Sequence, residues 1–111
     1  MDLSLTTHND GGTAVVGVSG EVDVYSAPAL GERINELLDS GQRRLVVDLN
    51  SVEFIDSTGL GTLVSGHNRA AELGGSLSLV CNVDRVIKLM RITGLDEVFT
   101  IKSDVSDALA D

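Results

Sequence analysis

Short alternating runs and apolar stripes at helical spacing follow one another along this chain. Leu3–Thr6 alternates apolar and polar side chains, as an edge strand does, and Thr13–Ser19 is typical of a second strand. Asn9–Gly12 between them is a strong turn signal, so the two strands are predicted to pair as a hairpin. The next segment, Gly20–Val24, is short and acidic, and we expect it to be exposed on alternate residues.

The first helix is predicted from Ala27 to Ser40. Ser26 is a good N-cap, and Pro28 is tolerated in the first turn. Gly41 is placed to end the helix in a left-handed conformation. The apolar stripe of this helix consists of Leu30, Ile34, Leu37 and Leu38.

A buried strand and a second helix follow. Arg43–Leu49 is a near-continuous apolar run, which is typical of a central strand covered by helices. The second helix starts in the segment Asp56–Gly61 and is terminated by Gly74 and Gly75. One face of this helix carries Leu60, Leu63, Val64 and His67.

The last part of the chain repeats the alternation of strand and helix. Ser76–Cys81 indicates a further central strand, and Asn82 is expected to cap a third helix that Gly94 closes. Val98–Ile101 is predicted to be a short last strand, and Ser103 to start a C-terminal helix. The apolar positions of these two helices are Val83, Val86, Ile87 and Met90, and then Val105, Ala108 and Leu109.

The order of these elements predicts an α/β fold. Strands joined through crossover helices are most easily parallel, whereas the early hairpin adds an antiparallel edge. The length of the chain, 111 residues, fits one domain over residues 1–111. We therefore expect a mixed β-sheet with an N-terminal hairpin and about four helices packed on it, in one layer or mainly on one face. The order of the strands in the sheet stays open.

Composition and charge narrow the classes of function. Hydrophobic residues make up 42% of the chain, enough for a core, but aromatic residues only 3%, which favours close packing of helices on a sheet over a stacking platform for bases or sugars. The net charge of −9 repels phosphate backbones and anionic lipids, which argues against binding to nucleic acid or to a membrane. The same charge fits a partner with a basic docking face, and it also fits plain solubility.

The sequence predicts neither a metal site, nor a cofactor site, nor a disulfide bond. Cys81 is the single cysteine, so no intrachain disulfide forms, and we expect it to be a small core residue. No ligand cluster has the spacing of a metal site, and no cofactor motif occurs. The start of the chain lacks the pattern of a signal peptide, and no apolar run approaches the roughly 20 residues that span a bilayer. We expect a cytoplasmic protein.

The segment Asp56–Gly61 is the most informative part of the sequence. Asp56 or Ser57 is expected at the N-cap of the second helix, where first-turn N–H groups lack intrahelical partners. A hydroxyl at this position is exposed, and a phosphate added to it is partly stabilised by the helix dipole and by free N–H groups. Gly59 and Gly61 lower the local side-chain bulk, which lets the backbone of another protein approach. The same residue types also form ordinary helix caps, so an ordinary cap stays an alternative at this point.

Nucleophilic catalysis by Ser57 has little support. His67 is predicted roughly 15 Å along the helix from Ser57, and His8 lies near a strand end beside the hairpin turn. The residue two before Ser57 is Ile55, so the Gly-x-Ser-x-Gly elbow of hydrolases is absent. Asp48 ends a central strand, as in a phospho-accepting receiver domain, but the acidic pair and the lysine that such a domain also needs are not found.

Two motifs together resemble a known family. Gly20-Glu21-Val22-Asp23, followed about thirty residues later by Phe54-Ile55-Asp56-Ser57-Thr58-Gly59-Leu60-Gly61, is similar to the anti-sigma factor antagonists, single-domain proteins of the STAS fold. Leu79–Asn82 and Arg91–Leu95 also fit the later strand and the third helix of that family. The resemblance extends from Leu3 to about Ala108.

The resemblance implies a partner-switching mechanism. The unphosphorylated antagonist binds an anti-sigma factor that is also a serine kinase, and this releases a sigma factor for transcription. The kinase phosphorylates the first serine of the motif, here Ser57, and a phosphatase restores the active form. Asp23 and Asp56 match acidic positions of the docking surface. Thr58 matches a neighbouring hydroxyl that is usually not the main acceptor.

Two other functions remain in competition with this one. A hydrolase or transferase with Ser57 as nucleophile is opposed by the missing base and oxyanion arrangement. A STAS subunit of a transporter or signalling assembly, without a kinase cycle, is opposed by the intact phosphoacceptor motif. The sequence leaves open which sigma factor is controlled and which signal reaches the phosphatase.

Overall fold

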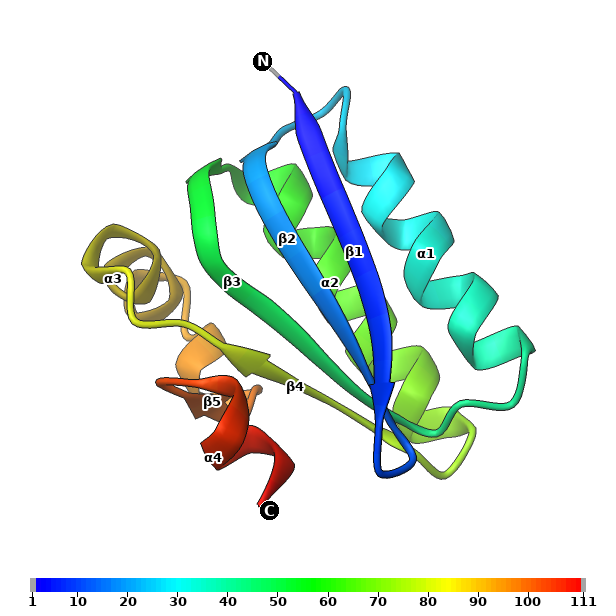
Figure 1. Cartoon of the computed structure of the whole chain (residues 1–111). Helices are drawn as coiled ribbons and strands as arrows, with labels where there is room; N and C mark the ends of the chain where they lie inside the picture. Colours follow the sequence, from blue (N-terminus) through cyan, green and yellow to red (C-terminus); the bar gives the residue numbers. More distant parts are fainter. Residues whose placement is uncertain (1, 111) are drawn as a thin grey trace.

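Five strands form one sheet, in the order in which they occur along the chain (Figure 1). The computed structural model describes residues 2–110. The first two strands pair in antiparallel fashion and every later pair is parallel, so the predicted mixed sheet with an N-terminal hairpin is confirmed. The strands are β1 (Leu3–Asp10), β2 (Thr13–Val22), β3 (Arg44–Ile55), β4 (Ser76–Val80) and β5 (Ile101–Lys102).

Within the described part of the chain, four helices and one 3₁₀ turn connect and follow these strands. Figure 1 shows α1 and α2 running together along one side of the sheet, with α4, in red, apart from them beside β5. The elements are α1 (Ala27–Asp39), α2 (Ser57–Glu72), α3 (Asp84–Ile92), the turn η1 (Leu95–Glu97) and α4 (Val105–Leu109). Within residues 2–110, none of these helices has the length and apolar composition that crossing a bilayer requires.

The central strands are buried on both faces of the sheet. Val46 and Val47 are neighbours on β3 and therefore point to opposite faces, and both are fully buried. On one face, Val46 packs with Ala108 of α4 in a small cluster. On the other, the three longer helices bury the main core, so helices cover mainly one face, as predicted. The largest side chains fully buried there include Leu30, Ile34, Leu38, Leu45, Leu49, Leu63, Leu79 and Met90.

The first helix ends as its sequence predicts. Gly41 has φ +102°, a conformation that a residue with a side chain rarely adopts. The N–H of Gly41 donates to the carbonyl of Leu38 (3.1 Å), and that of Gln42 to the carbonyl of Leu37 (3.0 Å). These two bonds satisfy the last carbonyls of α1 and return the chain toward β3.

Some local predictions were wrong. Asn82 does not cap α3: the N-cap position falls on Val83, without a side-chain cap, while the Asn82 side chain donates to the Ser103 carbonyl (3.4 Å) and its N–H donates to Oδ1 of Asn50 (2.6 Å). The last strand is Ile101–Lys102 rather than Val98–Ile101. Phe99 is instead buried in the main core, two residues after the end of the 3₁₀ turn.

The third strand is longer than predicted, and this extension carries the chain to the site. β3 continues past Leu49 to Ile55, and its pairing with β2 shifts register twice over this extension. Each shift places an extra residue in β3, as a β-bulge does, and bends the strand locally. At the far end of the pair, Val22 lies opposite Ile55, so the residues that follow these two strands emerge at the same edge of the sheet.

Candidate functional site

Asp56 is the N-cap of α2, and Ser57 is the first residue of this helix. One carboxylate oxygen of Asp56 accepts hydrogen bonds from the N–H groups of Thr58 (3.0 Å) and Gly59 (3.1 Å). The carbonyl oxygen of Asp56 accepts from Leu60 (3.0 Å), and its own N–H donates to the carbonyl of Val22 (3.2 Å). The side chain and the backbone of Asp56 therefore join the start of α2 to the end of β2.

The two hydroxyl residues that follow the cap are on the surface. Ser57 and Thr58 are both exposed. The backbone carbonyl of Thr58 accepts a hydrogen bond from the Thr62 hydroxyl (3.1 Å), one turn further along α2. An enzyme or a partner protein can therefore reach the hydroxyl of Ser57 without any opening of the core.

The two glycines of this turn differ in their surroundings. Gly59 is buried, and a Cβ placed on it would lie 2.8 Å from Cγ1 of Val22 and 2.7 Å from Cγ1 of Ile55. Gly61 is exposed, and a Cβ there would meet nothing within 4 Å. The missing side chain of Gly59 therefore serves the packing of α2 against the strand ends, whereas Gly61 leaves open space toward solvent.

Asp23 organises the loop between β2 and α1. Its Oδ1 accepts from the N–H groups of Tyr25 (2.9 Å) and Ser26 (3.0 Å). The hydrogen bond from Ser26 makes the largest contribution, and together the two bonds hold the pKa of the Asp23 carboxyl below its usual range. Burial has the opposite, smaller effect. The Ser26 hydroxyl donates to the carbonyl of Glu21 (2.7 Å) and accepts from the N–H of Asp23 (2.9 Å).

This loop differs from its prediction in one detail. Ser26 occupies the N-cap position of α1 as expected, but its side chain makes no cap hydrogen bond and closes the loop instead. The sequence interpretation missed the ring of hydrogen bonds between Asp23 and Ser26. This arrangement is an Asx turn, in which an aspartate side chain accepts hydrogen bonds from the N–H groups two and three residues later. The aspartate at position 23 is the sequence signal for it.

The fold brings Asp23 and Asp56 to one edge of the sheet. They directly follow Val22 and Ile55, which are partners in the parallel pairing of β2 with β3. Neighbouring strands are about 4.8 Å apart, so the two carboxylates share the edge from which Ser57 also projects. The sequence places these residues more than thirty positions apart, and only the pairing of the strands joins them.

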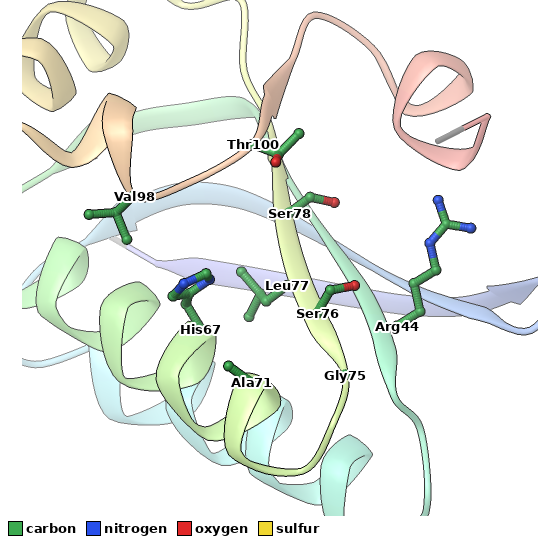
Figure 2. A pocket seen from close by; sticks show the side chains of 9 residues that line it. All are labelled: Arg44, His67, Ala71, Gly75, Ser76, Leu77, Ser78, Val98 and Thr100. Carbon is green, nitrogen blue, oxygen red and sulfur yellow. The ribbon is translucent and has the colours of Figure 1, made fainter.

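Neither histidine belongs to this site. His8 pairs with Val15 near the hairpin turn, at the opposite end of β2 from Asp23. His67 is half-buried, and its ring packs edge-to-face on Phe99 with the centroids 5.3 Å apart. His67, Leu77 and Val98 line a cavity of about 290 Å³ (Figure 2), which adjoins the later turns of α2, away from Ser57.

The histidine, cysteine and acidic side chains of residues 2–110 form no cluster of three that could hold a metal ion, and Cys81 is a core residue. Cys81 is 2% exposed, which agrees with the predicted core role. Burial raises the pKa of its thiol, and this outweighs the smaller lowering by a backbone hydrogen bond with Val83.

Comparison with known proteins identifies the family. Residues 4–108 match the STAS domain. The anti-sigma-B factor antagonist of Bacillus subtilis is 36% identical over 103 residues, which cover 93% of this chain and 94% of that protein. The anti-sigma-F factor antagonist RsfB of Mycobacterium tuberculosis is 31% identical over 107 residues, covering 96% of this chain and 87% of that protein.

A solved structure agrees with these sequence matches. The anti-sigma factor antagonist from Mycobacterium paratuberculosis superimposes with a TM-score of 0.91, at 30% identity, over 98% of this chain and 92% of that one. Sequence and fold therefore agree over nearly the full length. The chain belongs to the anti-sigma factor antagonists of the STAS domain family.

Proposed function

We propose that this antagonist works by partner switching and that Ser57 is its phosphate acceptor. Members of its family are non-enzymatic regulators whose partner is an anti-sigma factor. In the proposed cycle, the unphosphorylated chain binds an anti-sigma factor with serine kinase activity, which releases a sigma factor in the cytoplasm. Phosphorylation of Ser57 ends the contact, and a phosphatase restores the binding form.

The observation that carries this proposal is the position of the Ser57 hydroxyl. It is exposed at the first residue of α2, on the same sheet edge as Asp23 and Asp56. The backbone around it is held by the Asp56 cap and by the close packing of Gly59. A rigid, exposed serine suits both a kinase, which needs access, and a partner, which needs a fixed surface.

Hydrogen bonding at the start of α2 leaves little stabilisation of a phosphate on Ser57 that could offset charge repulsion in a complex. The Asp56 carboxylate already occupies the N–H groups of Thr58 and Gly59, and its carbonyl occupies that of Leu60. A phosphate on Ser57 therefore obtains little of the roughly 0.3–1 kcal/mol that an open helix start gives to an anion. This differs from the expectation that free N–H groups would receive the phosphate.

The added charge opposes docking more strongly than it affects the free protein. A phosphate carries about −1.5 to −2 charges at pH 7, and Asp56 is its neighbour in sequence. Water screens these charges in the free chain, but a docked partner excludes that water. At an effective dielectric constant of 20, two unit charges about 6 Å apart repel by about 3 kcal/mol, which corresponds to roughly a hundredfold in affinity. The free chain is expected to keep its shape.

Phosphate mapping tests the proposal directly. The purified chain is incubated with the anti-sigma factor kinase of its source organism and ATP, and the modified residue is located by mass spectrometry. We expect phosphate on Ser57 and dissociation of the complex. Phosphate on Thr58 instead would refute the site, and absence of both binding and phosphate would favour a STAS subunit of a transporter or signalling assembly without a kinase cycle.

A further inference from the structure

Aromatic side chains are scarce in this chain, and most of them are on its surface. The sequence contains two phenylalanines, one tyrosine and no tryptophan. Phe99 is 5% exposed and belongs to the core, but Tyr25 is 90% exposed and Phe54 is 47% exposed. Tyrosine and phenylalanine are enriched at the centres of protein interfaces. Two exposed aromatic side chains in a chain with so few aromatics therefore indicate a surface that binds another protein.

Both exposed aromatics lie at the edge of the sheet that carries Ser57. Tyr25 is in the loop after β2, two residues beyond Asp23, and Phe54 is near the end of β3, two residues before Asp56. In Figure 1 this edge is the one where β2 leads into α1 and β3 leads into α2. Val24, next to Tyr25, is also 56% exposed.

The loop presents Tyr25 in a fixed position. The Tyr25 N–H is bound by the Asp23 carboxylate, and the Ser26 hydroxyl ties the loop to the carbonyl of Glu21. An aromatic side chain on a backbone that is already ordered loses little conformational entropy on binding. Asp23 is therefore a positioning residue for Tyr25.

Phe54 borders an apolar groove along the free edge of β3. β4 pairs with β3 only as far as Asp48, and beyond it Arg85 of α3 donates a hydrogen bond to the Glu53 carbonyl of β3. The groove, about 300 Å³ in volume, has an apolar floor of Phe54, Ile55, Val86 and Leu89, with the charged Glu53 and Arg85 at its border. This volume suits one or two apolar side chains of another protein.

We propose that Tyr25 and Phe54 are the apolar anchors with which the unphosphorylated chain docks on its anti-sigma factor, an inference that rests on the function proposed above. The contact surface of that partner is expected to combine an apolar pocket for Tyr25, an apolar side chain for the Phe54 groove and basic residues around them. Asp23, Glu53 and Asp56 supply the negative charges that those basic residues would meet.

The charges favour this partner over a second copy of the chain. A symmetric dimer through this edge brings Asp23, Glu53 and Asp56 of one copy close to the same residues of the other. The net charge of −9 on each chain adds to this repulsion. A partner with basic residues removes the repulsion and still covers the exposed aromatic surface.

The test measures the affinity of the purified anti-sigma factor for matched variants by titration calorimetry. Tyr25→Ser and Phe54→Ser are compared with Leu73→Ser and Val98→Ser, which remove apolar side chains that are 40% and 44% exposed away from this edge. We expect each anchor variant to raise Kd at least about tenfold and each control to change it less than about twofold. Thermal unfolding checks the fold, and Phe54→Leu, which keeps an apolar side chain, should recover most of the affinity.

The binding measurements distinguish failure of the anchor assignment from failure of the proposed function. If Ser57→Asp weakens binding while both anchor variants bind like the wild-type chain, the anchor assignment is wrong and the proposed function stands. If the wild-type chain does not bind the anti-sigma factor at all, the proposed function is wrong and the anchors fall with it. If sedimentation shows a wild-type dimer that Tyr25→Ser dissociates, the patch serves self-association and the inference is wrong.

Discussion

Gly59 of α2 packs directly on Val22 at the end of β2. A Cβ on Gly59 would lie 2.9 Å from the Val22 carbonyl oxygen and 2.8 Å from its Cγ1 atom, closer than real Cβ atoms approach. The carbonyl belongs to the backbone and also accepts the N–H of Asp56 (3.2 Å), so it has little freedom to move. The absence of a side chain at Gly59 therefore sets the distance between α2 and the sheet next to Ser57.

Gly59→Ala should destabilise the fold, whereas Gly61→Ala should not. The clash at Gly59 is expected to cost about 1–3 kcal/mol, which outweighs the gain in helix propensity. Gly61 lies in the same turn with open space around it, so its alanine variant should gain up to about 1 kcal/mol. Urea unfolding at pH 7 gives both free energies of unfolding. Equal stability of the two variants would contradict the packing role of Gly59.

Two substitutions of Asp56 should separate the contribution of its cap hydrogen bonds to stability from that of its negative charge. Asp56→Ala removes the acceptor for Thr58 and Gly59 and should lower the free energy of unfolding by about 0.5–2 kcal/mol. Asp56→Asn keeps an acceptor oxygen at the N-cap and should lose only a few tenths of a kcal/mol. Guanidinium unfolding of the three proteins measures the difference. An alanine variant as stable as the wild type would show that the cap bonds add nothing to stability.

Much of the fold follows from local patterns, and the failures have tertiary causes. The hairpin and the first two helices are predicted because turn residues and apolar spacing agree within short windows. Asn82 has the right chemistry for a helix cap, but its side chain donates to the Ser103 carbonyl, 21 positions later, and its N–H donates to Asn50, 32 positions earlier. The order of the strands could not be predicted, because it depends on which strand edges pair after the helices have packed.

The candidate site also combines features that the local sequence predicts with features that depend on tertiary structure. Asp56 and Ser57 were expected at the start of a helix because the local motif is sufficient for that prediction. The role of Gly59 was not predictable, because it depends on Val22, which is brought near only by the pairing of β2 with β3. The rigid loop that Asp23 organises was also missed, since its hydrogen bonds are apparent only in three dimensions.

The hydrogen bonds to Asp23 predict a pH dependence of stability. Because they lower the pKa of the folded carboxyl, the ionised group stabilises the fold at every pH above its unfolded value of about 3.8. This contribution is lost as the pH falls through the folded value. Asp23→Asn keeps an acceptor oxygen but no charge, so it should be less stable than the wild type at pH 7, with the gap closing below about pH 3.8. Urea midpoints at pH 7, 5 and 3 measure this, and a gap that widens in acid would contradict the assignment.

Cys81 should be unreactive in the folded protein. Its side chain is 2% exposed, and burial raises the pKa of the thiol, so the nucleophilic thiolate is scarce at pH 8. Ellman's reagent should label the native chain slowly and the urea-unfolded chain at once. Ser106→Cys on the exposed side of α4, in a Cys81→Ala background, provides a rapidly reacting control. Fast labelling of native Cys81 would indicate that the strand end opens.

Charge and size at Ser57 can be separated with two variants of nearly equal volume. Ser57→Asp adds a negative charge beside Asp56, whereas Ser57→Asn adds similar bulk without charge. If repulsion drives release, the affinity for the anti-sigma factor should fall by up to about a hundredfold for Ser57→Asp and by less than about tenfold for Ser57→Asn. Raising the salt concentration should reduce the difference between the two variants, because mobile ions screen exposed charges. Calorimetric titrations at low and high salt measure both effects, and an equal loss for both variants would make bulk, rather than charge, the cause of release.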